Sequence, residues 1–303
     1  MNVCSRVIVL LGTAVALCGP VAAQLPDGAT RLVDVFGTPT RVLTLGLENR
    51  NSGDPVIFLQ SGAGTALEGW GDWPVALSEL APVVGYDRPG LGESPFDGFD
   101  PSPQRVATHA RELLDVLQIP PPYLLVGHSW GGPLILYFAA QYPDEVVGMV
   151  YLDPADPRIS RSELLLTDDE AEMERRGAAY REAVAALQSS SSPPGRAAES
   201  RVRSEFNAKE PEDRSVPNDP SVPTAIVLAT RIPNLAGGPY YIDEEWYQEY
   251  NRVRIGRFVD WSLGRPNITL MLATDAGHFV HLDARTLATE AVKRVLAAIE
   301  ASR

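Results

Sequence analysis

Residues 123–135 read YLLVGHSWGGPLI, and a polar serine stands there between two apolar segments. Tyr123 to Val126 has the composition of a buried strand, and the run after the glycines is typical of a helix. Gly127 and Gly131 flank the junction, which indicates a turn so tight that larger side chains would collide with neighbouring elements. The stretch predicts a strand that turns directly into a helix, with the hydroxyl of Ser129 projecting above a sheet.

Short apolar runs recur along the chain and alternate with segments of helical spacing. The runs are 56–59, 83–86, 123–126, 146–152, 224–229 and 268–272, and helical spacing covers 106–117, 134–142, 244–253 and 287–299. Continuous apolar runs suit strands of a parallel sheet that helices cover on both faces. Before them, 30–36 and 40–47 predict a hairpin with a turn at Gly37-Thr38-Pro39. The sequence predicts an α/β domain with a mostly parallel central sheet flanked by helices.

One segment interrupts this alternation, because 157–222 contains no convincing strand. Thr167 and Glu170 form a capping-box pattern before a charged helix that is expected to run to about Leu187. The stretch Ser189–Gly195 predicts a flexible break, and a second polar helix is expected over 197–209. We therefore expect a helical cap or lid of residues 157–222, inserted into a core domain of residues 24–156 and 223–303.

The first 23 residues carry a basic residue, an apolar stretch and small residues before a cleavage site after Ala23. This is typical of a secretory signal peptide, and the apolar stretch is too short to span a bilayer comfortably. An uncleaved anchor is the alternative. Cys4 and Cys18 both lie in this segment, so a mature chain would have no disulfide, zinc–thiolate site or cysteine nucleophile. We expect a secreted or periplasmic protein without stable membrane association after cleavage.

Composition limits the partners of the chain. Its 303 residues are 45% hydrophobic, which is enough for one large core with an insertion. The formal net charge is -13, which argues against nucleic acid or an anionic membrane as partner.

Three motifs resemble, in the same order along the chain, those of the α/β-hydrolase superfamily. They are YDRPGLGES at 86–94, GHSWGG at 127–132 and AGHFVHLD at 276–283. The similarity covers 56–301 apart from the cap. In that superfamily Gly-x-Ser-x-Gly between a strand and a helix is the nucleophile elbow. The resemblance implies an α/β-hydrolase fold with Ser129 as the nucleophile of a serine hydrolase.

A serine hydroxyl needs a base, and the mature chain offers four histidines. His109 falls in a helical pattern, and the ring of His128 is expected to point away from Ser129. His278 follows the last predicted strand, where the resemblance places the catalytic base, and His281 is expected to support its loop. No carboxylate and third imidazole complete a metal site, so we expect neither metal nor cofactor.

The acid of the triad departs from the common pattern, because no carboxylate follows the run 224–229 before Asp243. A known variation of the superfamily places the acid after the strand that follows the nucleophile's helix. Asp153 stands there, at the end of 146–152, where its carboxylate would orient the imidazole. A turn-capping role for Asp153 is the alternative, and Asp156 and Asp243 are the reserve acids.

The resemblance also implies an oxyanion hole made of two backbone N–H groups, those of Ala63 and Trp130. The family usually carries His-Gly before the first donor, whereas this chain has Ser61-Gly62. Arg88 is interpreted as a structural hydrogen-bond donor. Several aromatic residues are candidates for lining an acyl or alcohol pocket, namely Trp70, Trp73, Tyr240, Tyr241, Trp246 and Tyr247.

These features predict a secreted serine hydrolase that cleaves a small carboxylic ester through an acyl-enzyme. An acyltransferase, an amidase or a cofactor-free peroxidase would use the same triad, and a non-catalytic binding protein would keep the same fold. Serine at the elbow argues against dehalogenase and epoxide hydrolase activity, which needs an aspartate there.

Overall fold

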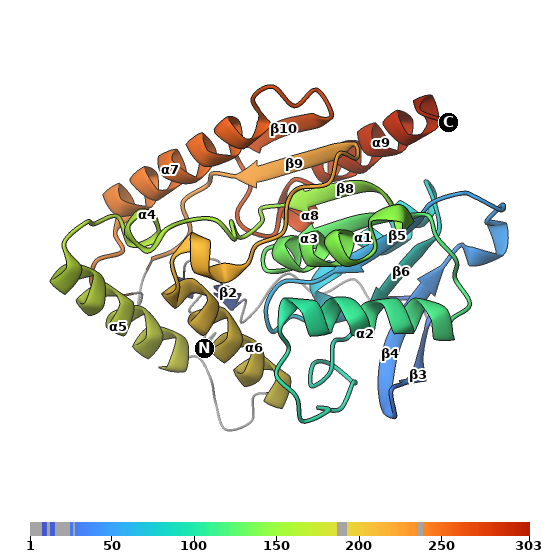
Figure 1. Ribbon diagram of the computed structural model, residues 1–303, viewed down its shortest axis with the longest axis horizontal. Coiled ribbons are helices and arrows are strands. Elements are labelled where there is room, and N and C mark those ends of the chain that lie inside the picture. Colours follow the sequence, from blue (N-terminus) through green and yellow to red (C-terminus); the bar gives the residue numbers. More distant parts are fainter. Residues whose placement is uncertain (1–7, 11–12, 16–24, 27, 187–192, 236–238) are drawn as a thin grey trace, which may run out of the picture.

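The protein is built on a mixed eight-stranded sheet, seen in a computed structural model that describes residues 8–10, 13–15, 25–26, 28–186, 193–235 and 239–303 (Figure 1). The strand order is β10-β9-β8-β7-β5-β6-β4-β3. The β3–β4 and β4–β6 pairs are antiparallel and the other neighbours are parallel. The strands are β3 Thr30–Val35, β4 Thr38–Leu45, β5 Val56–Gln60, β6 Val83–Tyr86, β7 Tyr123–His128, β8 Val146–Leu152, β9 Thr224–Ala229 and β10 Ile268–Ala273. The predicted α/β class is confirmed.

The hairpin that opens the sheet differs slightly from the prediction. Its turn is made by Phe36 and Gly37, which have φ values of 54° and 79°. Two consecutive residues with positive φ give the turn that matches the twist of paired strands. The predicted turn at 37–39 is therefore wrong, because Thr38 and Pro39 already belong to β4.

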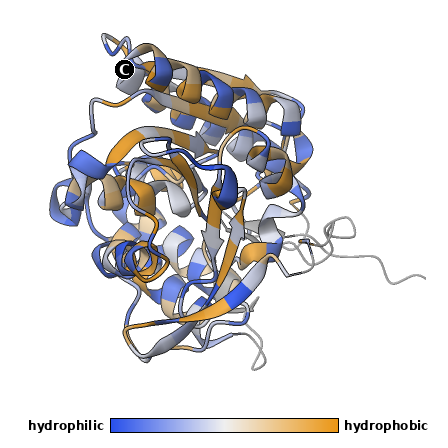
Figure 2. Cartoon of the chain, turned by 90° about the vertical axis from the view of Figure 1, so that its right-hand side faces the viewer, coloured by the Kyte–Doolittle hydropathy of each residue, from blue (hydrophilic) through white to orange (hydrophobic). Residues whose placement is uncertain are grey.

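Helices cover both faces of the sheet. Those of the core are α1 Trp73–Ser78, α2 Pro103–Val116, α3 Gly131–Gln141, α7 Glu244–Ser262, α8 Val280–Asp283 and α9 Arg285–Ala301. On one face α1 and α9 bury side chains such as Leu77 and Val292, and on the other α3 buries Ile135 and Phe138. The strands are mainly hydrophobic while the helices mix both kinds of residue, as expected for helices half exposed to water (Figure 2).

The segment between β8 and β9 is helical. It contains α4 Arg161–Leu165, α5 Glu170–Ala186, α6 Pro194–Ala208 and the short 3-10 helix Pro211–Arg214. The two longer helices confirm the predicted ones, but the capping box at Thr167 is wrong. Asp169 accepts the hydrogen bond from the N–H of Glu172 and so caps α5, because its carboxylate stands closer to the helix start. A capping box is present instead at Ser160 and Glu163 of α4. Most of the predicted break at 189–195 lies outside the described residues.

The first residues give little structural information. Within 1–23 the structure describes only β1 Ile8–Leu10 and β2 Thr13–Val15, which form an antiparallel pair. The predicted cleavage site after Ala23 lies outside the described residues. In the part of the chain that is described, none of the helices combines the length and the apolar character that a bilayer crossing requires.

Candidate active site

The junction between β7 and α3 is a strained turn centred on Ser129. The serine has a φ of 55°, which is uncommon for any residue other than glycine. Its backbone is held on both sides: its N–H donates to Leu152 O at 3.1 Å, and its carbonyl accepts from the N–H of Gly132 at 2.9 Å and of Ala155 at 3.0 Å. These bonds to the next strand and its loop keep the turn in place although its conformation is unfavourable.

Glycine is required on both sides of this serine. A Cβ atom at Gly127 would lie 2.5 Å from Gly131 O, and one at Gly131 would lie 2.0 Å from Gln60 O. Both obstacles are backbone atoms that cannot move aside. The steric reason predicted for the two glycines is therefore correct. The absence of a side chain at Gly131 also lets the end of β5 pack directly against the turn.

His278 lies next to this turn. It follows β10, and its Nδ1 lies 2.7 Å from the Oδ2 atom of Asp153. Its ring centroid is 4.7 Å from that of His128, the residue immediately before Ser129, and its carbonyl lies 2.8 Å from His128 Nε2. The structure therefore brings together the elbow, the predicted base and the predicted acid.

Asp153 occupies the end of β8 in a left-handed conformation, with a φ of 43°. Its Oδ1 atom accepts from the N–H of Ala229 at 2.9 Å and from Arg254 Nη1 at 2.5 Å. Burial alone raises the pKa of this carboxyl. The charge of Arg254 and the hydrogen bond to His278 outweigh burial, so the pKa is lowered to about 2. Asp153 is therefore ionised at neutral pH.

Arg254, a buried residue that no sequence pattern indicated, lies on α7 and is only 6% exposed. Besides Asp153, it donates to the carbonyl of Ala229 and to the side chain of Asn251. Asn251 itself donates to the carbonyl of Thr230, just after β9. One sequence feature could have indicated such a residue, namely the missing carboxylate after 224–229. At the end of β9 the guanidinium of Arg254 binds the Ala229 carbonyl, and it also binds Asp153 at the end of β8.

The other histidines have supporting positions. His281 Nε2 lies 2.9 Å from the carbonyl of Gly69, and burial lowers the pKa of His281 to about 4. Burial also lowers the pKa of His128 far below its usual value. Both rings are neutral near pH 7, and the ring of His128 lies between the other two, with centroids 4.7 Å from that of His278 and 4.9 Å from that of His281. His109 lies on α2, where Nε2 is 3.2 Å from Thr40 Oγ1.

The loop after β5 approaches the elbow closely. A Cβ atom at Gly62 would lie 3.2 Å from the Cβ of Ser129. Ala63, the predicted donor, follows at once and packs in the same cluster as Trp130. Arg88 donates to the carbonyls of Ser61 and Gly62 at 2.9 and 2.7 Å, so the donor role predicted for this side chain is confirmed.

Comparison with known proteins gives the family. The model of the alpha/beta hydrolase family matches residues 56–291. This chain belongs to that family.

Curated relatives of this chain match over short segments. It is 33% identical over 116 residues to a putative carbamate hydrolase, RutD, of Caulobacter segnis, covering 36% of this chain and 43% of the relative. It is 35% identical over 107 residues to a soluble epoxide hydrolase of Corynebacterium, covering 34% of this chain and 35% of the relative. The chain thus spans less than half the length of these relatives.

Solved structures agree over nearly the whole chain. A putative lipase from Acinetobacter baumannii superposes with a TM-score of 0.62, covering 90% of this chain and 92% of the lipase. Because only 17% of the residues are identical, this likeness concerns the fold alone.

The two reserve acids have other partners. Asp156 lies 2.5 Å from Arg257 Nε and also accepts from the N–H of Arg158. Asp243 caps α7 by accepting from the N–H of Trp246 at 2.8 Å. Neither of these contacts involves His278, whereas Asp153 touches it directly.

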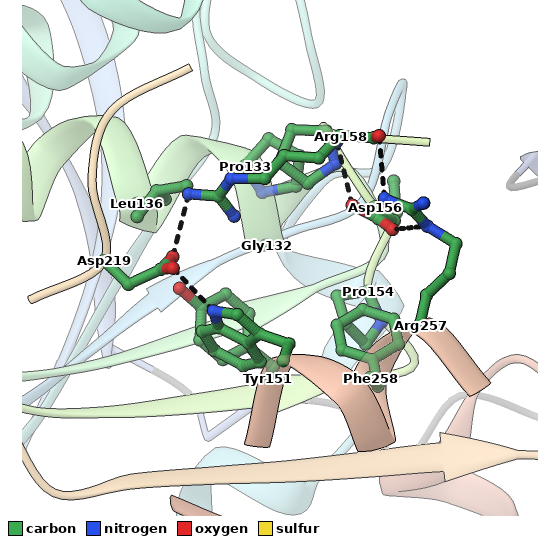
Figure 3. A pocket seen from close by; sticks show the side chains of 13 residues that line it. Gly132, Pro133, Leu136, Tyr151, Pro154, Asp156, Arg158, Asp219, Arg257 and Phe258 are labelled. Atoms are coloured by element: carbon green, nitrogen blue, oxygen red, sulfur yellow. Dashed lines mark hydrogen bonds and ion pairs between the residues drawn. The ribbon is translucent and has the colours of Figure 1, made fainter. Parts of the chain in front are cut away.

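A small pocket opens beside the start of α3 (Figure 3). Gly132 and Tyr151 form part of its wall, and the ion pairs Arg257–Asp156 and Arg158–Asp219 line its polar side. Ser129, His278 and Asp153 are not among its lining residues, so this pocket is separate from them.

The aromatic candidates divide into two groups. Trp70 and Trp73 are buried in the core, with ring centroids 4.7 and 5.8 Å from that of His281. Tyr241 and Trp246 form a cluster with Leu165 of α4. Trp70 and Trp73 therefore support the loop that carries His281, and the second group joins the residues around the start of α7 to α4. Within the described residues, no cluster of three or more potential metal-ligating side chains is present.

Proposed function

We propose that this chain is a serine hydrolase that cleaves a small carboxylic ester through Ser129, His278 and Asp153. The observation that carries the proposal is the 2.7 Å contact between His278 Nδ1 and an ionised Asp153, beside a glycine-flanked serine of positive φ. A nucleophile, a base and an orienting acid are the groups that acyl transfer requires.

The contact supports Nε2 of His278 as the nitrogen that acts as the base. Because Nδ1 faces a carboxylate, it carries the proton, and Nε2 keeps the lone pair. In the first step Ser129 Oγ bonds to the ester carbonyl carbon while its proton passes to Nε2. The carbonyl π pair moves to oxygen, and when the tetrahedral intermediate collapses, the alcohol leaves with the proton from His278. Water then repeats the sequence on the acyl-enzyme and releases the acid.

The remaining groups stabilise the charges that form during the reaction. Asp153 stabilises the imidazolium that forms in each half-reaction. The N–H groups of Ala63 and Trp130 would receive the oxyanion, and the closeness of the Gly62 backbone to Ser129 supports this assignment. A donor of this kind contributes about 2.7–4 kcal/mol to transition-state stabilisation.

The choice of an ester as substrate is supported by the nucleophile. An alkoxide attacks acyl carbon, whereas the epoxide hydrolases of this superfamily need an aspartate at the elbow. The N-terminal segment 1–23 further supports the proposal that the enzyme works outside the cytoplasm, after cleavage of a signal peptide.

The proposal is tested on the purified mature chain with p-nitrophenyl esters of graded chain length and with a fluorophosphonate probe. Ser129→Ala should lower kcat by at least about 10⁴-fold and abolish labelling, because no other group replaces the nucleophile. Ser302→Ala, at the exposed C-terminal end, is the control and should behave as the parent chain. Full turnover in Ser129→Ala would reject the mechanism, and a parent chain that is neither active nor labelled would indicate a binding protein.

A further inference from the structure

The cap reaches the candidate oxyanion hole through one buried carboxylate. Glu199 lies on α6, is 2% exposed, and pairs with Arg88, which is equally buried. Its Oε1 atom lies 2.5 Å from Arg88 Nε, and its Oε2 accepts from Arg88 Nη2 at 2.9 Å. Oε2 also accepts from the backbone N–H of Gly64 at 2.6 Å.

The same arginine holds the other end of this loop. Arg88 donates to the carbonyls of Ser61 and Gly62, and Glu199 holds the N–H of Gly64. Three backbone groups of the four residues 61–64 are thus bound by one ion pair. Ala63, the residue assigned to the oxyanion hole, lies between them.

The geometry of the peptide group fixes the direction in which the Ala63 N–H points. In a trans peptide the C=O and the following N–H point to opposite sides. Because the Gly62 carbonyl points to Arg88, the Ala63 N–H points away from the ion pair. Ser129 lies close to this backbone, since a Cβ atom at Gly62 would approach the serine Cβ to 3.2 Å.

We propose that Glu199 of the cap is a positioning residue that, together with Arg88, aims the Ala63 N–H at the oxyanion. This inference rests on the proposed function and adds a cap residue to its machinery. Arg88 also neutralises the carboxylate, so that the negative charge of Glu199 does not oppose the oxyanion.

Further contacts hold α6 against the core. The N–H of Gly195 donates to the carbonyl of Gly90 at 3.1 Å, and Arg196 donates to the carbonyl of Gly64 at 3.2 Å. Phe206 meets the ring of Trp130, beside the nucleophile, at 5.4 Å in an edge-on arrangement. The helix therefore touches both of the segments that supply the predicted oxyanion donors.

Glu199→Gln is the variant that tests the inference. The glutamine has the same shape, but one of its two terminal atoms is a donor, so it cannot accept from both Arg88 Nε and Gly64 N–H. We expect kcat for a p-nitrophenyl ester to fall by about 10- to 100-fold while KM stays within about twofold, because the donor acts mainly in the transition state. Glu205→Gln, on the exposed side of the same helix, should change neither.

A second measurement separates positioning from folding. A trifluoromethyl ketone adds to Ser129 Oγ, the serine proton passes to His278, and the former carbonyl oxygen carries the charge. Its Ki should rise in Glu199→Gln by the same factor as kcat falls. A lower kcat with unchanged Ki would mean only a loss of folded enzyme and would overturn the inference, as would parental kcat and Ki. If Ser129→Ala is inactive in the same assay, the proposed function stands whatever the Glu199 result.

Discussion

Two buried arginine–carboxylate pairs flank the candidate site, and they have different tasks. In Arg254–Asp153 the carboxylate contacts His278, the proposed base, and the arginine binds the other oxygen of that carboxylate. In Arg88–Glu199 neither partner touches the triad, and both bind the backbone of one loop. Both pairs have the same 2.5 Å separation and similar burial. The two pairs therefore differ in what they contact: one presents a carboxylate to His278, and the other binds the backbone of residues 61–64.

The largest expected effect comes from the charge that the first pair presents to His278. Asp153→Asn should lower kcat by about 10³- to 10⁴-fold, because an amide neither stabilises the imidazolium nor fixes the proton on Nδ1. Steady-state kinetics on an ester measures the loss. Asp156→Asn should have only a small effect, since its carboxylate binds Arg257. A greater loss in Asp156→Asn than in Asp153→Asn would show that the acid has been assigned to the wrong residue.

Removing the supporting arginine should affect mainly stability. Arg254→Met leaves Asp153 buried without its cation, and we expect the free energy of unfolding to fall by about 3–5 kcal/mol. Urea unfolding followed by circular dichroism measures this change. Arg252→Met is the matched control on the same helix, because Arg252 is 70% exposed and pairs only at the surface with Glu249. If both variants lost the same small amount of unfolding free energy, the buried Arg254–Asp153 pair would matter no more for stability than a surface pair.

The smallest expected effect is a loss of folding stability at low pH, and it should come from His281. His281 has a folded pKa of about 4 against an ordinary value of 6.5, so the unfolded chain binds more protons between these values. Its contribution to stability is complete above pH 6.5 and is lost as the pH falls toward 4. From pH 7 to 5 the parent should lose about 2 kcal/mol more than His281→Gln, measured by urea unfolding at both values. An identical loss in the two proteins would contradict the assignment.

Asp153 acts in a different pH window. Its folded pKa of about 2 lies below the ordinary 3.8, so its contribution to stability is present above pH 3.8 and is lost as the pH falls toward 2. Loss of stability near pH 5 therefore comes from the neutral histidines and not from this carboxylate.

The sequence predicted the sheet well, because strands buried on both faces leave continuous apolar runs, such as 146–152 and 224–229, that match β8 and β9. It also indicated the elbow and His278, whose local patterns are distinctive. Asp153 was predicted as the acid from its place at a strand end together with the resemblance to the superfamily, in which a known variation places the acid after this strand. These features depend on residues that are close together in the sequence, and such residues are the ones that a sequence pattern describes.

The parts that were missed depend on contacts between distant residues. Arg254 meets Asp153 across 101 positions, and Glu199 meets Arg88 across 111. A polar helix such as α6 has the composition of an exposed element, so its buried glutamate gave no signal. The predicted capping box was wrong for a different reason. Asp169 stands immediately before α5 and caps it, whereas Thr167 lies two residues further away.

The contact between Gly90 and Gly195 has a consequence for the evolution of this family. A Cβ atom at Gly195 would lie 2.6 Å from Pro89 O, and one at Gly90 would lie 2.5 Å from Gly195 N, so neither position accepts a larger residue without a shift of the backbone. Gly195 and Glu199 stand one helical turn apart and face the same way. We therefore expect Gly-x-x-x-Glu at the start of this helix in related proteins whose inserted segment docks in the same manner.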